Sequence, residues 1–318
     1  MARLTGLEIA WAAQLACLFE VSVEKPGNVS PRVGFADARF EDFAASAVAI
    51  GPAMGDAGLA GVGETIARAA AATRRLVATN TNLGMILLLA PLAKAAARLG
   101  AGGDLRAALN GAGVEPRAAL HGAGGDLRAA LNGVLEDLTV QDARLAYAAI
   151  RAAAPAGMGK VERHDVGEDD VSVTLRAAMD AARERDSIAR EYVTDFAITF
   201  TLGAATLQRC WQDGAAFSDA VVTAFLTILA AVPDTLIARK NGLRAAEDVS
   251  RRAARVLAAG GRFSEQGRAR LAELAGELGD EAHALNPGTT ADLVAAALFV
   301  FLTEGEMLAD VPALTARW

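Results

Sequence analysis

The sequence predicts an all-α protein that forms a single helical domain. Apolar residues recur at helical spacing along nearly the whole chain, and convincing strand alternation is absent. No linker long enough to separate two domains interrupts this pattern, so the 318 residues are expected to share one core. Helices are expected at 4–23, 39–54, 62–78, 83–99, 139–153, 172–184, 187–212, 216–231, 234–241, 244–259, 264–283 and 290–305.

Two of these helix starts carry a capping pattern. Thr139-x-x-Asp142 and Thr289-x-x-Asp292 both resemble a capping box, in which a hydroxyl and a carboxylate bind the free backbone N–H groups of the first turn. The spacing therefore predicts that one helix begins beside Thr139 and another beside Thr289.

Residues 103–135 contain three copies of an eleven-residue unit, GDLRAALNGAG, VEPRAALHGAG and GDLRAALNGVL. One unit supplies only a short helical turn ended by glycine and cannot bury a face alone. The third copy continues directly into Leu138 and the next helix. We therefore expect 103–124 to be an insertion on the surface.

Composition excludes several classes of protein. The net charge of −7 and a pI near 5.2 argue against a nucleic-acid partner, which would require a basic face. The longest apolar runs fall short of the roughly 20 residues that a membrane span needs. The N-terminus lacks the apolar core of a signal peptide, and Cys17 and Cys210 lie in apolar helical surroundings typical of reduced thiols. These features predict a cytoplasmic protein.

Polar side chains gather beside proline and glycine at the predicted helix ends, where backbone N–H and C=O groups are free to bind ligands. We expect these ends to form a central polar cleft. The segments concerned are 20–28, 79–84, 165–166, 185–192, 233–240 and 285–292.

The first two segments suit phosphate binding. Glu20 lies near the end of the first helix, and Lys25 and Asn28 follow on a loop from which they could face a phosphate, although an ordinary turn explains the lysine equally well. Asn80 and Asn82 precede the most apolar helix of the chain. Asn82 would be its ordinary N-cap, while the additional donors suit a phosphate oxygen at a helix N-terminus.

Two further segments are acidic. Asp165, with the acids at 168–170, could hold Mg²⁺ or could be a solvated turn. Asp186 has Arg190 four residues later, which allows a plain ion pair. Glu191 and Asp195 are also four residues apart, so on one helix they would share a face and repel unless a metal or a cation lay between them.

The last two segments surround a short helix at 234–241 and the turn before the helix at 290–305. Asp234 could cap the short helix, and Arg239 and Lys240 at its end complement the helix dipole. Together the two cations suit a triphosphate. Asn286 lies in a sharp Asn-Pro-Gly turn, and Asp292 could serve equally as a cap or in function.

Other nucleotide motifs fail. Gly157-Met-Gly159-Lys160 lacks the first glycine and the Ser/Thr of a phosphate loop, and no strand–glycine–helix unit indicates a dinucleotide fold. Histidine spacing for a metal, a nucleophile elbow and a CxxC pair are also missing.

In their order along the chain and in their residues, the polar segments resemble the motifs of the triphosphoribosyl-dephospho-coenzyme A synthase family. The resemblance extends from Glu20 to about Leu302. The resemblance implies an all-helical fold. It also implies transfer of the triphosphoribosyl part of ATP to the ribose 2′-hydroxyl of dephospho-coenzyme A, with release of adenine. The chain departs from the family at two positions. Related sequences usually have histidine where this chain has Ser30. The characterised branch has a Thr-His-Lys-like motif where this chain has the segment that contains Leu83.

The resemblance also suggests roles for the residues. Glu20, Asp186 and Glu191 are the expected catalytic carboxylates, which would stabilise a cationic ribosyl centre or accept the hydroxyl proton. Mg²⁺ is the expected cofactor, and the partners are ATP and a nucleotide-like acceptor, with a homo-oligomer possible. Asp165 and Asp234 are the expected metal ligands, and the expected substrate contacts are Lys25, Asn28, Asn80, Asn82, Arg239, Lys240 and Asn286.

Three alternatives remain open from the sequence. The same fold could act on another acceptor, in biosynthesis of a cofactor such as those of one-carbon metabolism. An all-helical Mg²⁺-dependent ADP-ribose-type hydrolase also uses clustered acids. It would transfer the ribosyl group to water without any acceptor. A non-catalytic nucleotide-binding protein would bind ATP without releasing adenine.

Overall fold

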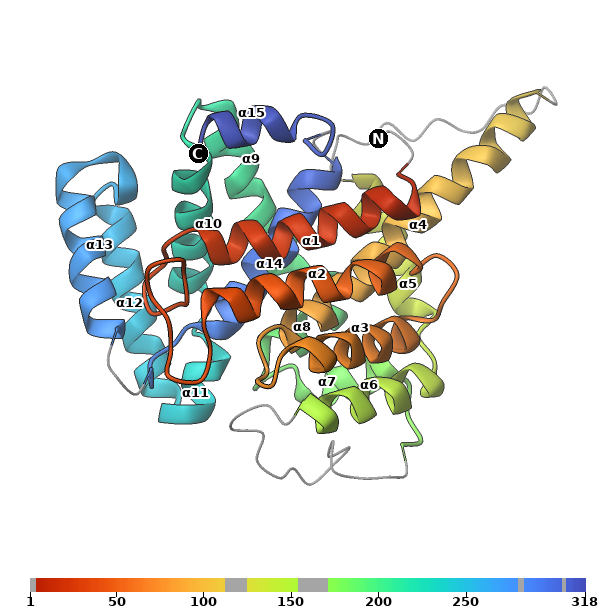
Figure 1. Ribbon diagram of the computed structural model, residues 1–318, viewed down its shortest axis with the longest axis horizontal. Helices are drawn as coiled ribbons and strands as arrows, with labels where there is room; N and C mark the ends of the chain where they lie inside the picture. Colours follow the sequence, from red (N-terminus) through yellow and green to blue (C-terminus); the bar gives the residue numbers. More distant parts are fainter. Residues whose placement is uncertain (1–3, 112–124, 154–170, 280–282, 305–306) are drawn as a thin grey trace.

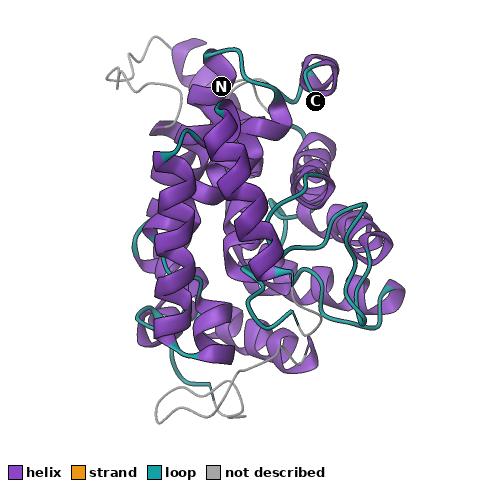
Figure 2. Cartoon of the chain, turned by 90° about the vertical axis from the view of Figure 1, so that its left-hand side faces the viewer, coloured by secondary structure: helices purple, strands orange, loops and turns teal. Residues whose placement is uncertain are grey.

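The computed structural model describes residues 4–111, 125–153, 171–279, 283–304 and 307–318. Within these ranges every regular element is a helix (Figure 2). The one β-bridge of the described residues joins Ser30 and Val33. The all-α prediction is confirmed. The α-helices are α1 Gly6–Ser22, α2 Phe40–Gly55, α3 Val62–Leu76, α4 Leu83–Gly111, α5 Gly125–Glu136, α6 Val140–Ala153, α7 Leu175–Ala182, α8 Ser187–Val193, α9 Ala205–Gln212, α10 Phe217–Ala231, α11 Thr235–Asn241, α12 Leu243–Ala258, α13 Glu265–Leu278, α14 Gly288–Glu304 and α15 Val311–Ala316. A π-helix, η1, spans Ile198–Ala204, and a short 3₁₀ helix, η2, spans Gly261–Phe263.

Helix α14 is the centre of the core. Every residue from Leu293 to Thr303 is buried, because α1, α4, α10 and η1 pack around the helix (Figure 1). A helix that is apolar on all sides requires such surroundings. The acid Asp292 lies at the edge of this buried stretch.

Helices α1 and α2 run antiparallel and lie very close to each other (Figure 1). The two backbones come close at Gly6 and Gly55: a Cβ on Gly6 would lie 2.6 Å from the Gly55 carbonyl oxygen. Glycine at both positions therefore lets the two backbones touch. Helices α3 and α6 extend this side of the molecule, and α10 to α13 form the other side.

The predicted helix over 187–212 is wrong as a continuous element. Helix α8 ends at Val193, and Asp195 and Phe196 adopt left-handed backbone angles, with φ of 52° and 56°. The Glu191 carboxylate then accepts hydrogen bonds from the backbone N–H groups of Ile198 and Thr199, at 2.9 and 2.8 Å, where η1 begins. Glu191 and Asp195 therefore do not share a helix face, and the repulsion expected between them does not arise.

One of the two predicted capping boxes forms. The Thr139 hydroxyl accepts from the Asp142 N–H at 3.1 Å, and the Asp142 carboxylate accepts from the Thr139 N–H at 2.9 Å. The box predicted at Thr289 is wrong. Helix α14 already begins at Gly288, and the Thr289 hydroxyl instead accepts a hydrogen bond from the Thr235 hydroxyl at 3.2 Å.

The repeat segment is more helical than the sequence predicted. Helix α4 does not end near residue 99 but continues to Gly111, so the first copy extends this helix away from the body of the molecule (Figure 1). The third copy forms α5, which was not predicted, and neither was α15. Residues 112–124 lie outside the described residues, and the prediction that 103–124 is an insertion stays a prediction.

Both cysteines are free and buried, as expected. In the described part of the chain, one helical segment, Leu83–Gly100, is long and apolar enough to cross a membrane, and α10 with α11 passes the same test only as a pair bent by 53°. Since 72% of Leu83–Gly100 is buried inside the fold, it serves as a core helix.

Candidate active site

Charged side chains from four helix ends meet near Asp292. The charges of Glu20, Asp186 and Asp234 each raise the pKa of Asp292, and the positive charge of Arg239 opposes them. Burial is the largest cause of the increase. We call Glu20, Asp186, Asp234 and Asp292 the carboxylate cluster. It joins the C-terminal end of α1 to the N-terminal ends of α8, α11 and α14.

Glu20 and Lys25 form a buried ion pair at the end of α1. Lys25 Nζ lies 3.1 Å from Glu20 Oε1 and donates to the backbone carbonyl oxygens of Glu20 and Val23. Burial raises the pKa of Glu20 and lowers the pKa of Lys25, whereas their mutual attraction acts the other way on both. Apart from this contact with Lys25, Glu20 Oε1 has no hydrogen-bond partner among the described residues. The lysine thus closes α1 and holds Glu20 in place, while its predicted phosphate contact stays a prediction.

Asp186 and Arg239 link α8 to α11. One Asp186 oxygen caps α8 by accepting from the Ile188 N–H at 2.8 Å, and the other binds Arg239 Nη1 at 2.6 Å. Among the described residues, the ion-pair partner of Asp186 is therefore Arg239 and not Arg190, which the sequence spacing suggested. Lys240, at the next position, is exposed.

Both carboxylate oxygens of Asp234 accept hydrogen bonds from backbone N–H groups or from a hydroxyl. Its Oδ1 accepts from the N–H groups of Leu236 and Ile237, at 2.9 and 3.1 Å. Its Oδ2 accepts from the N–H and the hydroxyl of Thr290, at 2.7 and 2.8 Å. Burial raises the pKa of Asp234 and these hydrogen bonds oppose the increase. Asp234 therefore joins the start of α11 to the start of α14.

Asp292 is the carboxylate that the sequence did not assign. It is half-buried, and no hydrogen bond from another described side chain or backbone group reaches it. Gly84 at the start of α4 makes room for it, because a Cβ on Gly84 would lie 2.0 Å from Asp292 Oδ2. One sequence signal could have identified Asp292: it is the only charged residue of α14 before Glu304.

Two of the four predicted asparagines make hydrogen bonds that support the fold, and the other two each have a buried amide atom without a hydrogen-bond partner among the described residues. Asn80 Oδ1, not Asn82, accepts from the Leu83 N–H at 3.2 Å at the start of α4, whereas Asn82 Nδ2 donates to the Ser46 carbonyl oxygen. Asn28 Nδ2 and Asn286 Oδ1 are buried without a hydrogen-bond partner among the described residues. The loops that carry these two residues touch, since a Cβ on Gly27 would lie 3.0 Å from Pro287.

The described residues do not fit a metal ion held by the protein alone. Among them, no three His, Cys, Asp or Glu side chains lie close enough to share an ion. Asp234, a predicted metal ligand, already has both oxygens bound by donors, and Asp165 lies outside the described residues. Glu191 is also separate from the cluster, because its carboxylate is buried against the start of η1.

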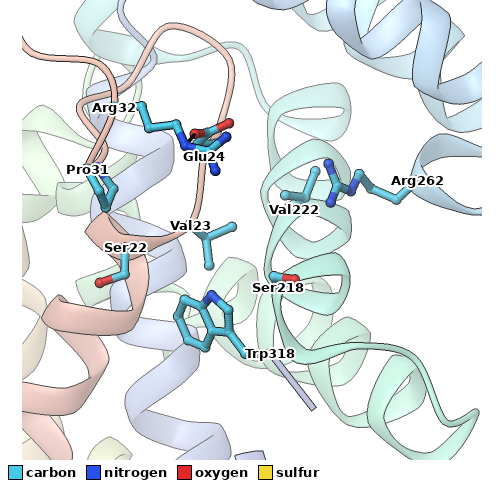
Figure 3. A pocket seen from close by; sticks show the side chains of 9 residues that line it. All are labelled: Ser22, Val23, Glu24, Pro31, Arg32, Ser218, Val222, Arg262 and Trp318. Carbon is cyan, nitrogen blue, oxygen red and sulfur yellow. Dashed lines mark ion pairs between the residues drawn. The ribbon is translucent and has the colours of Figure 1, made fainter. Parts of the chain in front are cut away.

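A cavity of about 320 Å³ lies beside the cluster rather than within it. It opens between the end of α1, α10 and the C-terminus of the chain (Figure 3). Its lining includes Ser22, Val23, Arg32, Ser218, Arg262 and Trp318.

An all-helical domain with acids, cations and amides from distant segments gathered at its helix ends is the kind of protein that binds a polar small molecule. Comparison with known proteins specifies the class further. The model of the CitG family, ATP:dephospho-CoA triphosphoribosyl transferase, matches residues 7–310. The chain therefore belongs to this family of transferases, which use ATP and dephospho-CoA.

One solved structure has the same fold. It is the crystal structure of a protein from Archaeoglobus fulgidus described as a triphosphoribosyl-dephospho-CoA synthase. The two chains are 26% identical, with a TM-score of 0.57, and the match covers 82% of this chain and 98% of the other. A comparison with curated proteins found no match.

Proposed function

We propose that the chain transfers the triphosphoribosyl group of ATP to the ribose 2′-hydroxyl of dephospho-coenzyme A, and that the carboxylate cluster performs the transfer. The observation that carries this assignment is Asp292, a half-buried carboxylate without a hydrogen-bond donor among the described residues. It lies where five of the six polar segments meet, those that carry Glu20, Gly84, Asp186, Asp234 and Asp292 itself. Membership of the CitG family supports the substrates.

The reaction exchanges one bond at the ribose C1′ of ATP. The C1′–N9 bond breaks as adenine leaves with the bonding electrons and gains a proton, and the acceptor oxygen forms a bond to C1′ as its hydroxyl loses a proton. Asp292 accepts that proton, because burial and neighbouring negative charges raise its pKa. Glu20, fixed by Lys25, stabilises the positive charge that develops on the ribose.

The cations near the cluster would receive the triphosphate. Arg239 already faces Asp186, and Lys240 follows it on the exposed side of α11. Mg²⁺ remains part of the proposal as an ion that accompanies ATP, since Mg²⁺ usually keeps waters and substrate phosphates as ligands. Both substrates are metabolites of the cell interior, which supports a cytoplasmic location.

Adenine release from ATP, with and without dephospho-coenzyme A, tests the reaction. Release that requires the acceptor is expected. Release without it would indicate hydrolysis, and ATP binding without release would indicate another acceptor or a non-catalytic protein. Omitting Mg²⁺ is expected to abolish release.

Asp292→Asn tests the cluster. It keeps the shape of the side chain but cannot accept a proton, so kcat for adenine release is expected to fall by about 10²- to 10⁴-fold. Asp37→Asn makes the same change at an exposed position and should leave the rate unchanged. Wild-type kcat in Asp292→Asn would remove Asp292 from the chemistry.

A further inference from the structure

We propose that the adenine of ATP binds between two loops, 23–39 after α1 and 283–287 before α14, where Asn28 and Asn286 recognise the edge of the base. This inference rests on the proposed function, because adenine is the leaving group of that reaction. These residues would select ATP among the nucleoside triphosphates.

The two loops meet beside the carboxylate cluster. A Cβ on Gly27 would lie 3.0 Å from Pro287 Cδ, so the loops are in contact. The first loop follows Glu20 at the end of α1, and the second leads into α14 and Asp292. A base held between the loops would therefore be close to the carboxylates that act on the attached ribose, as the reaction requires.

Each loop carries an asparagine with an unsatisfied amide atom. Asn28 is only 7% exposed, and its Nδ2 has no hydrogen-bond partner among the described residues. Asn286 Oδ1 is buried in the same condition. Such atoms are costly to bury, so a ligand that pairs with them is favoured. Adenine offers both partners, because its 6-amino group donates and a neighbouring ring nitrogen accepts.

An aromatic stack joins the same two loops. The rings of Phe35 and His283 have centroids 3.7 Å apart and planes inclined by 28°. His283 also adopts a left-handed backbone conformation, with φ of 46°, which is uncommon for a residue with a side chain. A base that parts the loops to reach the two amides replaces the ring–ring stack with base–ring stacking, so the cost of opening is largely offset.

The surroundings of loop 283–287 favour ATP over the acceptor, which also contains adenine. Asn241 at the end of α11 donates through Nδ2 to the Ala284 carbonyl oxygen at 2.6 Å. The two cations proposed for the triphosphate, Arg239 and Lys240, directly precede Asn241. Arg239 Nε is itself buried without a hydrogen-bond partner among the described residues. The base and the phosphates of one ATP molecule would therefore adjoin the same loop.

Ordered water is the simpler explanation of two unsatisfied amide atoms, because buried polar groups commonly bind it. Water would give neither asparagine an influence on the choice of nucleotide. It also does not account for two stacked rings between the same loops.

Equilibrium binding of ATP, GTP and dephospho-coenzyme A, each measured alone, tests the proposal. Wild type should bind ATP about ten-fold or more tightly than GTP, because guanine has an acceptor oxygen where adenine has its amino group. Asn286→Leu should raise the Kd of ATP by about ten-fold or more and remove most of this preference. Asn132→Leu, on α5, is the matched control and should leave the Kd values unchanged.

Phe35→Leu is the second variant. Every base has an aromatic face, so this change should raise the Kd values of ATP and GTP by a similar factor and keep their ratio. Phe263→Leu is its control, since Phe263 is 56% exposed on η2 and lies outside both loops. The Kd of dephospho-coenzyme A should stay unchanged in all of these variants.

Equal Kd values of ATP and GTP in wild type would overturn the proposal, and this comparison needs no variant to fold. Unchanged ATP binding in both Asn286→Leu and Phe35→Leu would also overturn it. So would a rise in the Kd of dephospho-coenzyme A alone, since the loops would then hold the acceptor.

The proposed function is judged separately. Acceptor-dependent adenine release by wild type supports it whatever these Kd values show. ATP binding that depends on Asn286 and Phe35 without any adenine release would support the adenine subsite and overturn the reaction.

Discussion

At the scale of single residues, Asp234 and Asp292 show how two identical side chains take different roles in different surroundings. Asp234 accepts four hydrogen bonds from α11 and α14 and acts as a structural link. Asp292 lies near it but receives no hydrogen bond from the described residues, and the charges of three carboxylates act on it against that of Arg239 alone. A carboxylate without donors is available to bind a proton from substrate.

The raised pKa of Asp292 predicts a pH dependence of stability. An aspartate with a higher pKa in the folded state holds more protons when folded, so the free energy of unfolding decreases as pH rises from the unfolded pKa to the folded one. Asp292→Asn removes the contribution of this carboxyl group to that decrease in the free energy of unfolding. Denaturant titrations at about pH 4 and about pH 8 should show a smaller decrease for the variant than for wild type. Equal decreases would contradict the raised pKa.

The buried Glu20–Lys25 pair predicts a large effect on stability. Lys25→Met leaves Glu20 buried without its cation, which should lower the free energy of unfolding by about 3–5 kcal/mol. The double variant Glu20→Gln/Lys25→Met should recover much of this loss in urea denaturation. If Lys25→Met instead left stability unchanged and raised only the KM for ATP, Lys25 would bind phosphate, as the sequence suggested.

At the scale of elements, the break between α8 and η1 is stabilised from the repeat segment. Arg128 on α5 donates through Nε to the Asp195 carbonyl oxygen at 2.9 Å and lies 5.6 Å from the Phe200 ring. It thus holds the left-handed turn at Asp195 and Phe196. The third copy of the repeat therefore has a structural role.

The three copies provide their own controls for this role. Arg128→Ala removes a charged donor from a strained turn and should destabilise the protein by about 1–3 kcal/mol. Arg106→Ala and Arg117→Ala change the equivalent residues of the first and second copies and should leave the Tm unchanged. Equal effects at the three arginines would show that the earlier copies also support the fold.

At the scale of the whole molecule, the carboxylate cluster joins helices that are far apart in sequence. Glu20 comes from α1, Asp186 precedes α8, Asp234 precedes α11 and Asp292 lies in α14. A ligand bound here contacts several elements at once, so it stabilises the folded state as a unit.

ATP is therefore expected to raise the Tm of the wild-type protein. At a concentration about one hundred times the Kd, binding should add about 2.7 kcal/mol to the free energy of unfolding. Asp292→Asn should retain this increase, because the variant loses a proton acceptor and not the contacts of the triphosphate. No change in Tm with ATP in wild type would show that the site does not bind it.

The sequence by itself determined the all-helical class and the family. Helical spacing predicts helices locally, so the positions of α1, α2, α10 and α12 could be predicted within a few residues. The motifs at the helix ends also indicated which segments would carry polar groups. These features depend on residues that are near one another in the chain.

Only the tertiary structure decided which polar residues are free to act. The sequence could not show that Asp234 is saturated by Thr290, that Lys25 is buried against Glu20, or that Gly84 leaves room for Asp292. Nor could it show the break after α8, which depends on Glu191 capping η1 and on Arg128 from another helix. Hydrogen-bond satisfaction and burial are set by contacts between distant segments, and a linear pattern does not contain those contacts.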